Sequence, residues 1–278
     1  MIRAYDNSTV YKKSIMRHDN NKGVSTMTEM KIDVKGLSRI EEKIQMIPLD
    51  EGAIYLVGPI QLPVNLYGET VTFQWYCWLH CQEVTEDFDR MLEKLSSENL
   101  AEFQQSSVLT YGDFSFDEDA IIRMHSICHT GDIFGSKRCD CGFQLKQSMK
   151  MIAEHGTGAL FYLANHEGRG IGLFSKAMAY ILQENGYDTV EANQALGFVD
   201  DSRNYDDVIK VLKTLRSKPV TLITNNPKKL EALRNAGLPV LGRTPLWGDV
   251  SEFNKAYLDT KVNRSGHLRD EETCPNNE

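Results

Sequence analysis

The sequence predicts an α/β fold, in which a mixed sheet with flanking helices is preceded by a β-rich N-terminal segment. From residue 117 onward, apolar runs of strand length alternate with amphipathic segments of helix length, which is typical of βα units. Between residues 47 and 112, the apolar runs are instead rich in β-branched and aromatic residues and are separated by Gly and Pro, which indicates consecutive strands.

The N-terminal half contains two expected strands and one expected helix. The runs AIYLVGPI (53–60) and ETVTFQWYCW (69–78) have strand composition, and DFDRMLEKLSSENLAEFQQ (87–105) has a helical pattern. Trp75 and Trp78 could form a platform for a ligand. Because they alternate along a half-buried strand, we expect them to pack in the core instead.

The C-terminal half contains the alternating elements in the order β, α, β, α, α, β, α. The expected strands are 120–126, 158–165 and 220–225, and the expected helices are 143–155, 172–186, 206–215 and 227–237. Three of these helices end at Gly156, Gly186 and Gly237, a residue that often terminates helices because it adopts positive φ without strain.

Both ends of the chain are polar and lack periodicity. We expect residues 1–30 to be a flexible N-terminal tail and residues 264–278 to be a flexible C-terminal tail. We then expect residues 31–116 to form the β-rich N-terminal segment and residues 117–263 to form the α/β core. No internal repeat interrupts this division.

Composition excludes several classes of protein. The 278 residues carry a net charge of −8, which argues against a general nucleic-acid binder, because phosphate-backbone binding requires clustered Lys and Arg. The first residues lack the apolar run of a secretory signal, and no stretch reaches the length of a membrane span. Six cysteines without a signal fit a reducing compartment. We therefore expect a cytoplasmic protein without membrane or nucleic-acid partners.

Three cysteines are the strongest chemical signal in the sequence. Cys128, Cys139 and Cys141 have the spacing C-x10-C-x-C, and no fourth cysteine lies nearby. Three thiolate ligands leave one coordination position of zinc open, which is typical of catalytic rather than structural sites. Buried free cysteines are the alternative. The neighbouring Lys137 and Arg138 favour the metal site, because cations stabilise thiolates.

A glycine-rich turn follows the expected strand at 158–165. In NHEGRGIG, backbone N–H groups at a helix start can approach a phosphate, although such turns are common. The glycine spacing is not G-x-G-x-x-G, which excludes a dinucleotide-binding oxidoreductase of the Rossmann type. Glu167 offers an acceptor that suits the edge of guanine, and Arg169 offers a planar donor that suits phosphate.

Two further segments suggest an anionic ligand. Asp201 and Arg203 in DDSRNY read either as a solvated ion pair or as an acid–base group beside an arginine that holds phosphate. In TNNPKK, Lys228 and Lys229 lie at the start of a helix, where the helix dipole disfavours positive charge. A bound anion would explain these lysines.

Together these segments resemble the GTP cyclohydrolase II family, zinc enzymes at the entry to riboflavin biosynthesis. The resemblance extends from residue 122 to 267 and is carried by RMHSICHTGD, RCDCGFQL, HEGRGIGL, KAMAYILQENGYDTVEAN, DDSRNY, TNNPKK and YLDTK, in family order. The N-terminal part shows no clear resemblance to the dihydroxybutanone phosphate synthase domain that is often fused to this family.

The resemblance implies one zinc ion per chain, held by Cys128, Cys139 and Cys141. It also implies nucleotide-contacting positions at Arg123, Met124, His125, Ser126, Ile127, Gln144, Glu167, Gly168, Arg169, Thr189, Thr224 and Lys229. One of them departs from the family, because Ile127 stands where a glutamate is common. Ala164 and Asn165 likewise replace a more basic or Gln-containing turn.

The resemblance further implies three catalytic residues. Asp201 corresponds to a proton acceptor, Arg203 to a nucleophile on the α-phosphate, and Tyr180 to a tyrosine near the reacting base. Because a guanidinium stays protonated well above neutral pH, a purely electrostatic role for Arg203 stays open.

The expected reaction is the zinc-dependent hydrolysis of GTP, which opens the imidazole ring of guanine and releases formate and pyrophosphate. The product would be 2,5-diamino-6-hydroxy-4-(5-phosphoribosylamino)pyrimidine. Mg²⁺ would accompany the substrate phosphates, and the resemblance implies a homodimer. Two alternatives stay open: a ring-opening homologue of a secondary pathway, and a zinc-stabilised nucleotide-binding module without catalysis.

Overall fold

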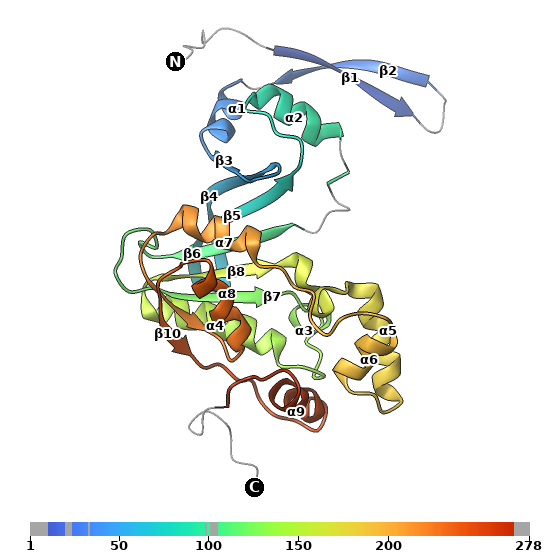
Figure 1. Cartoon of the computed structure of the whole chain (residues 1–278). Coiled ribbons are helices and arrows are strands. Elements are labelled where there is room, and N and C mark those ends of the chain that lie inside the picture. Colours follow the sequence, from blue (N-terminus) through green and yellow to red (C-terminus); the bar gives the residue numbers. More distant parts are fainter. Residues whose placement is uncertain (1–10, 20–23, 33, 98, 101–104, 270–278) are drawn as a thin grey trace. The chain divides into compact units, whose positions relative to one another are not determined.

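The computed structural model describes residues 11–19, 24–32, 34–97, 99–100 and 105–269 (Figure 1). The chain divides into two compact units, Met1–Gln45 and Met46–Glu278. In the first unit, β1 (Tyr11–Asp19) pairs antiparallel with β2 (Val24–Ile32), and α1 (Val34–Glu41) follows. This hairpin lies largely within the segment for which we expected no regular structure, whereas the expected domain limits stay predictions.

The second unit is built around a mixed sheet with strand order β10-β9-β7-β8-β6-β5-β4-β3. Its strands are β3 (Ile44–Pro48), β4 (Ala53–Leu66), β5 (Glu69–Cys81), β6 (Ser106–Tyr111), β7 (Ile121–Ser126), β8 (Gly158–Leu163), β9 (Val220–Ile223) and β10 (Val240–Thr244). Strands β10, β9, β7 and β8 are parallel, and β6, β5 and β4 continue the sheet in antiparallel pairs. The predicted α/β class with a mixed sheet is thus confirmed.

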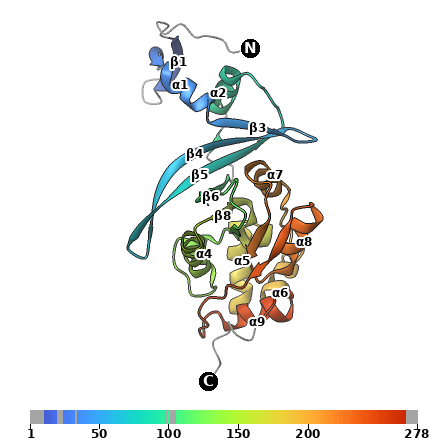
Figure 2. The ribbon, with the colours of Figure 1, turned by 90° about the vertical axis from the view of Figure 1, so that its left-hand side faces the viewer.

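Helices cover both faces of this sheet (Figure 2). The α-helices in the described part of this unit are α2 (Phe88–Ser97), α3 (His129–Asp132), α4 (Cys141–His155), α5 (Leu173–Glu184), α6 (Thr189–Ala195), α7 (Asp206–Leu215), α8 (Pro227–Asn235) and α9 (Lys255–Asn263). Successive residues of β7 point to opposite faces, so Ile122 joins the core under α7 and α8, while Ile121 packs with Ile152 of α4.

Most of the expected elements are present, but several described elements of this unit were not anticipated: β3, β6, β10, α3, α6, α9 and the 3-10 helix η2 (Ala164–Gly170). Trp78 is buried in the core as predicted, whereas Trp75 is half-buried. The expected C-terminal tail comprises residues 264–278. The structure describes its residues 264–269, and residues 270–278 lie outside the described residues. No helix in the described part of the chain has the length and apolarity needed to cross a membrane.

The parallel strands position the site. Strands β7, β8 and β9 end at Ser126, Leu163 and Ile223, and because they run in one direction their carboxyl ends meet at one edge of the sheet. The segments that leave this edge contain the cysteines, the glycine-rich turn and the TNNPKK run. Open α/β sheets bind their ligands at this edge.

Leu222 tests the assignment of the core. Its side chain in β9 is completely buried, whereas Leu241 in the adjacent β10 is 66% exposed. We expect Leu222→Ala to lower the free energy of unfolding by about 2–5 kcal/mol through lost burial and a residual cavity. The matched Leu241→Ala should change it by less than about 0.5 kcal/mol. Urea denaturation followed by circular dichroism measures both, and equal effects would contradict the described packing.

Candidate active site

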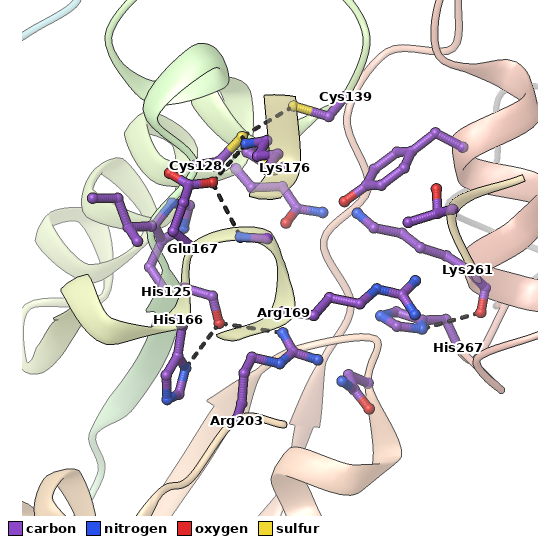
Figure 3. Close-up of a pocket in the computed structure, with 18 of the residues that line it drawn as sticks. His125, Cys128, Cys139, His166, Glu167, Arg169, Lys176, Arg203, Lys261 and His267 are labelled. Carbon is purple, nitrogen blue, oxygen red and sulfur yellow. Dashed lines mark hydrogen bonds and ion pairs between the residues drawn. The ribbon is translucent and has the colours of Figure 1, made fainter. Parts of the chain in front are cut away.

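A single pocket at the carboxyl ends of β7, β8 and β9 gathers nearly all of the predicted site residues (Figure 3). Its empty volume, open mouth included, is about 1080 Å³, which is enough for a nucleotide. Two predicted residues do not line it. The side chain of Met124 is fully buried in the core on the opposite face of β7, and Asp201 lies behind Arg203.

The three cysteines meet at one end of the pocket. Their sulfur atoms all lie within 4.8 Å of one another, and the Sγ atoms of Cys128 and Cys139 are 3.6 Å apart. Three thiolates around a tetrahedral zinc would be separated by about 3.8 Å, so the donor set and its spacing fit this metal. Hydrogen bonds from the other two thiols, together with Lys176, hold the pKa of Cys128 far below its usual value.

The segment between Cys139 and Cys141 is a turn. In an extended strand, by contrast, the side chains of these two cysteines would lie on the same face. Cys139 lies in this turn and Cys141 is the first residue of α4, so the start of the helix directs its thiol toward the cluster. Gly131 in α3 leaves the space that the sulfur atoms occupy. A Cβ atom at this position would lie 2.9 Å from Cys139 Sγ and 3.1 Å from Cys128 Sγ.

Lys176 of α5 joins the cysteines to the glycine-rich turn. Its Nζ donates to Cys128 Sγ at 3.2 Å and to Glu167 Oε1 at 2.6 Å. The other carboxylate oxygen of Glu167 accepts the backbone N–H of His129 at 2.7 Å. Glu167 therefore braces the segment that follows the first cysteine. The predicted contact of Glu167 with guanine would therefore use a carboxylate lone pair that these hydrogen bonds leave free.

Asp132 fixes the backbone of the first cysteine. Its Oδ2 accepts the backbone N–H of Cys128 at 2.9 Å and the hydroxyl of Tyr162 at 3.1 Å. The carboxylate also lies 3.1 Å from His125 Nε2. Burial lowers the pKa of His125, and Asp132 only partly opposes this effect.

Tyr180 of α5 lies beside the cysteines, as its predicted role requires. Its hydroxyl is 3.2 Å from Thr130 Oγ1, and the guanidinium of Arg138 lies 4.2 Å from the centre of its ring. Burial raises the pKa of Tyr180 above its usual value. The phenol is therefore protonated at neutral pH and can donate a proton.

Positive charge collects deeper in the pocket. Lys229 is buried, and its Nζ donates to the carbonyl oxygen of Met124 at 2.7 Å. Burial, followed by the charges of Arg123, Arg203 and Lys261, lowers the pKa of Lys229 well below its usual value. Such a cluster is costly unless an anion compensates it.

Two members of the cluster lack an acidic partner. Arg123 donates to the Gln144 side chain at 2.5 Å and to the carbonyl oxygen of Ile223 at 3.0 Å, whereas Lys261 pairs with Asp140 at 2.7 Å. Within the described ranges, neither Arg123 nor Lys229 lies within ion-pair distance of an Asp or Glu. Two buried cations are thus available to a ligand.

Arg203 and Asp201 form a bidentate pair. Nε and Nη2 of Arg203 donate to the two carboxylate oxygens at 2.7 and 2.6 Å. Burial alone would raise the pKa of Asp201, but hydrogen bonds and charge from Arg203 outweigh it and bring this pKa to about 2. Because the side chains are only 12% and 15% exposed, this is not the solvated surface pair that the spacing also allowed.

The glycine-rich turn is wound tightly against this pair. Gly168 and Arg169 adopt φ values of +60° and +66°, and the Arg169 side chain pairs with Asp200. The backbone N–H of Ser202 donates to the carbonyl oxygen of Arg169 at 3.1 Å. A Cβ atom on Gly170 would lie 2.5 Å from Ser202 Oγ, and the φ of +95° at this position favours glycine.

The remaining predicted positions lie on the pocket wall. Thr189 is the first residue of α6, and Thr224 follows β9, where its Oγ1 accepts the backbone N–H of Asn226 at 3.0 Å. Ile127 is half-buried, and its backbone N–H donates to the carbonyl oxygen of Leu163 at 3.1 Å. Its side chain brings no polar group to the pocket.

Sequence reasoning missed several residues that line the pocket. They are Arg138, His166, Ile171, Lys176, Ala179, Gln183, Asn193, Asn225, Asn226, Trp247, Tyr257, Lys261 and His267. Some stand inside the quoted motifs, such as His166 in HEGR and Lys261 in YLDTK. Four buried nitrogens of the lining have no hydrogen-bond partner among the described residues: Arg123 Nε, His125 Nδ1, Asn193 Nδ2 and Trp247 Nε1.

Comparison with known proteins agrees with this arrangement. The sequence model of GTP cyclohydrolase II matches residues 93–245, which is more than half of the chain. The chain belongs to the GTP cyclohydrolase II family. All three cysteines, the glycine-rich turn and the Asp201–Arg203 pair lie inside the matched range, whereas Lys261 and His267 lie beyond it.

Curated relatives are similar to this chain over 158 to 165 residues. The "Riboflavin biosynthesis protein RibBA" of Bacillus subtilis is 52% identical over 158 residues, which cover 56% of this chain and 39% of the relative. That of Aquifex aeolicus is 46% identical over 165 residues, which cover 59% and 41%. The "GTP cyclohydrolase-2" of Shewanella amazonensis is 49% identical over 164 residues, which cover 59% and 80%. The match thus covers about two fifths of the length of the RibBA relatives.

Substitution of Gly131 tests the predicted metal site directly. We expect Gly131→Ala to displace the sulfur atoms and to lower both the zinc content of the purified protein and its zinc affinity. The matched control is Gly242→Ala in β10, because a Cβ atom there meets nothing within 4 Å. Elemental analysis and competition with a chromogenic chelator measure the effect. Full zinc binding by Gly131→Ala would contradict the described cluster.

Proposed function

We propose that this protein hydrolyses GTP in riboflavin biosynthesis, opening the imidazole ring of guanine and releasing formate and pyrophosphate. The product would be 2,5-diamino-6-hydroxy-4-(5-phosphoribosylamino)pyrimidine. One observation carries the proposal: a cluster of three thiols with the geometry of an open zinc site shares a pocket with buried cations that lack acidic partners. A nucleoside triphosphate offers a ring to the first and anionic oxygens to the second.

The cysteine end of the pocket would act on the base. Cys128, Cys139 and Cys141 would hold zinc, which when bound supplies Lewis-acid activation of the water that attacks C8 of guanine. Tyr180, protonated at neutral pH, would donate a proton to the amine that develops as the ring opens. Lys176 would offset the negative charge of the three thiolates.

The cationic end of the pocket would hold the triphosphate. Arg123 and Lys229 have no acidic partner among the described residues, so phosphate oxygens would relieve their mutual repulsion. Arg203 keeps N–H donors beyond those that bind Asp201, and we assign it to the α-phosphate as an electrostatic group. Mg²⁺ would accompany the outer phosphates, as hard oxygen ligands favour.

Selection of guanine would depend on the wall between these ends. Gln144, Glu167 and Arg169 line it, and each is already held by neighbouring side chains, which preorganises them for a planar base. Ile127 offers only its backbone, so base selection there would depend on shape. A homodimer and a cytoplasmic location remain predictions that follow from the family.

The decisive experiment incubates the purified protein with GTP, Zn²⁺ and Mg²⁺ and measures formate, pyrophosphate and the pyrimidine product separately. We expect all three in equal amounts. Formate without pyrophosphate would instead indicate a homologue with a different product. Binding of GTP without any turnover would favour the non-catalytic module.

Lys229 tests the phosphate end of the pocket. Lys229→Met should lower kcat/KM for GTP about 10- to 100-fold, because a hydrogen bond from a charged group contributes about 1.5–3 kcal/mol. The matched control is Lys228→Met, since Lys228 is exposed on the same helix. Steady-state kinetics measures the difference, and calorimetric titration with a triphosphate checks the binding. Similar values for both variants would show that Lys229 does not contact the substrate.

A further inference from the structure

The hydroxyl of Ser126 lies where two functional groups of the pocket meet. Ser126 ends β7 and is half-buried at the pocket wall. Its Oγ is 3.2 Å from Nδ1 of His166 and 3.3 Å from Nη1 of Arg203. Figure 3 shows Arg203 and His166 on the same side of the pocket.

The direction of each hydrogen bond follows from its chemistry. The Nε2 atom of His166 lies 2.7 Å from the carbonyl oxygen of Asn204, which can only accept, so Nε2 carries the proton. Burial lowers the pKa of His166 to about 4, which leaves the ring neutral and the Nδ1 lone pair free at neutral pH. Because Arg203 can only donate, the hydroxyl of Ser126 donates to Nδ1 of His166.

These contacts have the arrangement of an activated nucleophile. A hydroxyl hydrogen-bonds to a neutral imidazole, and a third group fixes the tautomer of that imidazole. The ring of His166 also packs edge-on against Tyr205, with centroids 5.0 Å apart and planes at 83°. His166 is only 2% exposed, whereas Ser126 lines the pocket.

Arg203 is poorly suited to be the nucleophile itself. Its guanidinium has no acceptor lone pair, and its bidentate pair with Asp201 raises its pKa further despite the opposing effect of burial. Its positive charge 3.3 Å from Ser126 Oγ would instead stabilise negative charge on that oxygen. A phosphate held by Arg203 would also lie against Ser126.

We propose that Ser126 is the nucleophile that releases pyrophosphate, with His166 as its general base and Asn204 as the group that orients His166. This proposal rests on the proposed function and deepens it. A bond forms between Ser126 Oγ and the α-phosphorus, and the bond from that phosphorus to the bridging oxygen breaks, so pyrophosphate leaves with the electron pair. The hydroxyl proton passes to Nδ1 of His166. Water then attacks the phosphorus, and the serine oxygen leaves with the proton returned by His166.

Rapid-quench experiments with enzyme in excess over GTP labelled at the α-phosphorus would trap the adduct. We expect protein-bound label that survives acid, as an oxygen-linked phosphodiester does, and that maps to the tryptic peptide 124–137. An adduct on Arg203 would instead be labile to acid and would block cleavage after residue 203. That result would overturn the proposal, as would a burst of pyrophosphate without any protein-bound label.

Three variants sharpen the test. Ser126→Ala should abolish the adduct, and His166→Gln should slow its formation about 100-fold or more, because a general base contributes about that much. Ser136→Ala is the matched control in the same tryptic peptide, and it should label like the wild type. Undiminished labelling of Ser126→Ala would overturn the proposal even if other variants misfold.

Formate measured in the same samples separates this proposal from the function on which it rests. A wild-type protein that releases formate and pyrophosphate without a Ser126 adduct would refute the serine nucleophile and leave the GTP hydrolase standing. A wild-type protein that releases neither would refute both.

Discussion

Buried positive charge without acidic partners is the constraint on which the pocket depends. Desolvated cations are costly, and here they are concentrated in a chain whose net charge is −8. Three of the cations each form an ion pair with one carboxylate: Arg203 with Asp201, Lys261 with Asp140 and Lys176 with Glu167. Arg123 and Lys229 receive none in the described part of the chain. The site is therefore completed electrostatically only when an anion enters.

The distribution of charge also makes the two ends of the pocket chemically different. Thiols collect around Gly131 at one end, and cations collect around Lys229 toward the other. Lys176 belongs to the thiol end, where it touches both Cys128 and the carboxylate that braces the same segment. A ligand with an uncharged ring at one end and phosphates at the other would be oriented by these fields before any specific contact forms.

The sequence predicts the site better than it predicts the edges of the fold. The C-x10-C-x-C spacing predicts a common site for the cysteines, and the resemblance to the family implies that Glu167 and Lys229 belong to the same site. By contrast, β6 was missed because its inward-facing positions include Ser106 and Thr110, so hydrophobic alternation does not mark it as a strand. Lys176 was missed for a related reason: in a helical pattern it resembles a solvent-facing lysine, and its partners come from segments distant in the sequence.

The C-terminal segment extends the site beyond the range that the family model matches. The backbone of Leu246 accepts the Gln144 amide, and Gly248 packs so closely on Asp140 that a Cβ atom would lie 2.6 Å away. Lys261 then reaches the same carboxylate. Asp140, which stands between two of the clustered cysteines, is thus held by a segment outside the matched range. Evolutionary change in that segment could retune the pocket while the cysteines, the glycine-rich turn and the Asp201–Arg203 pair stay intact.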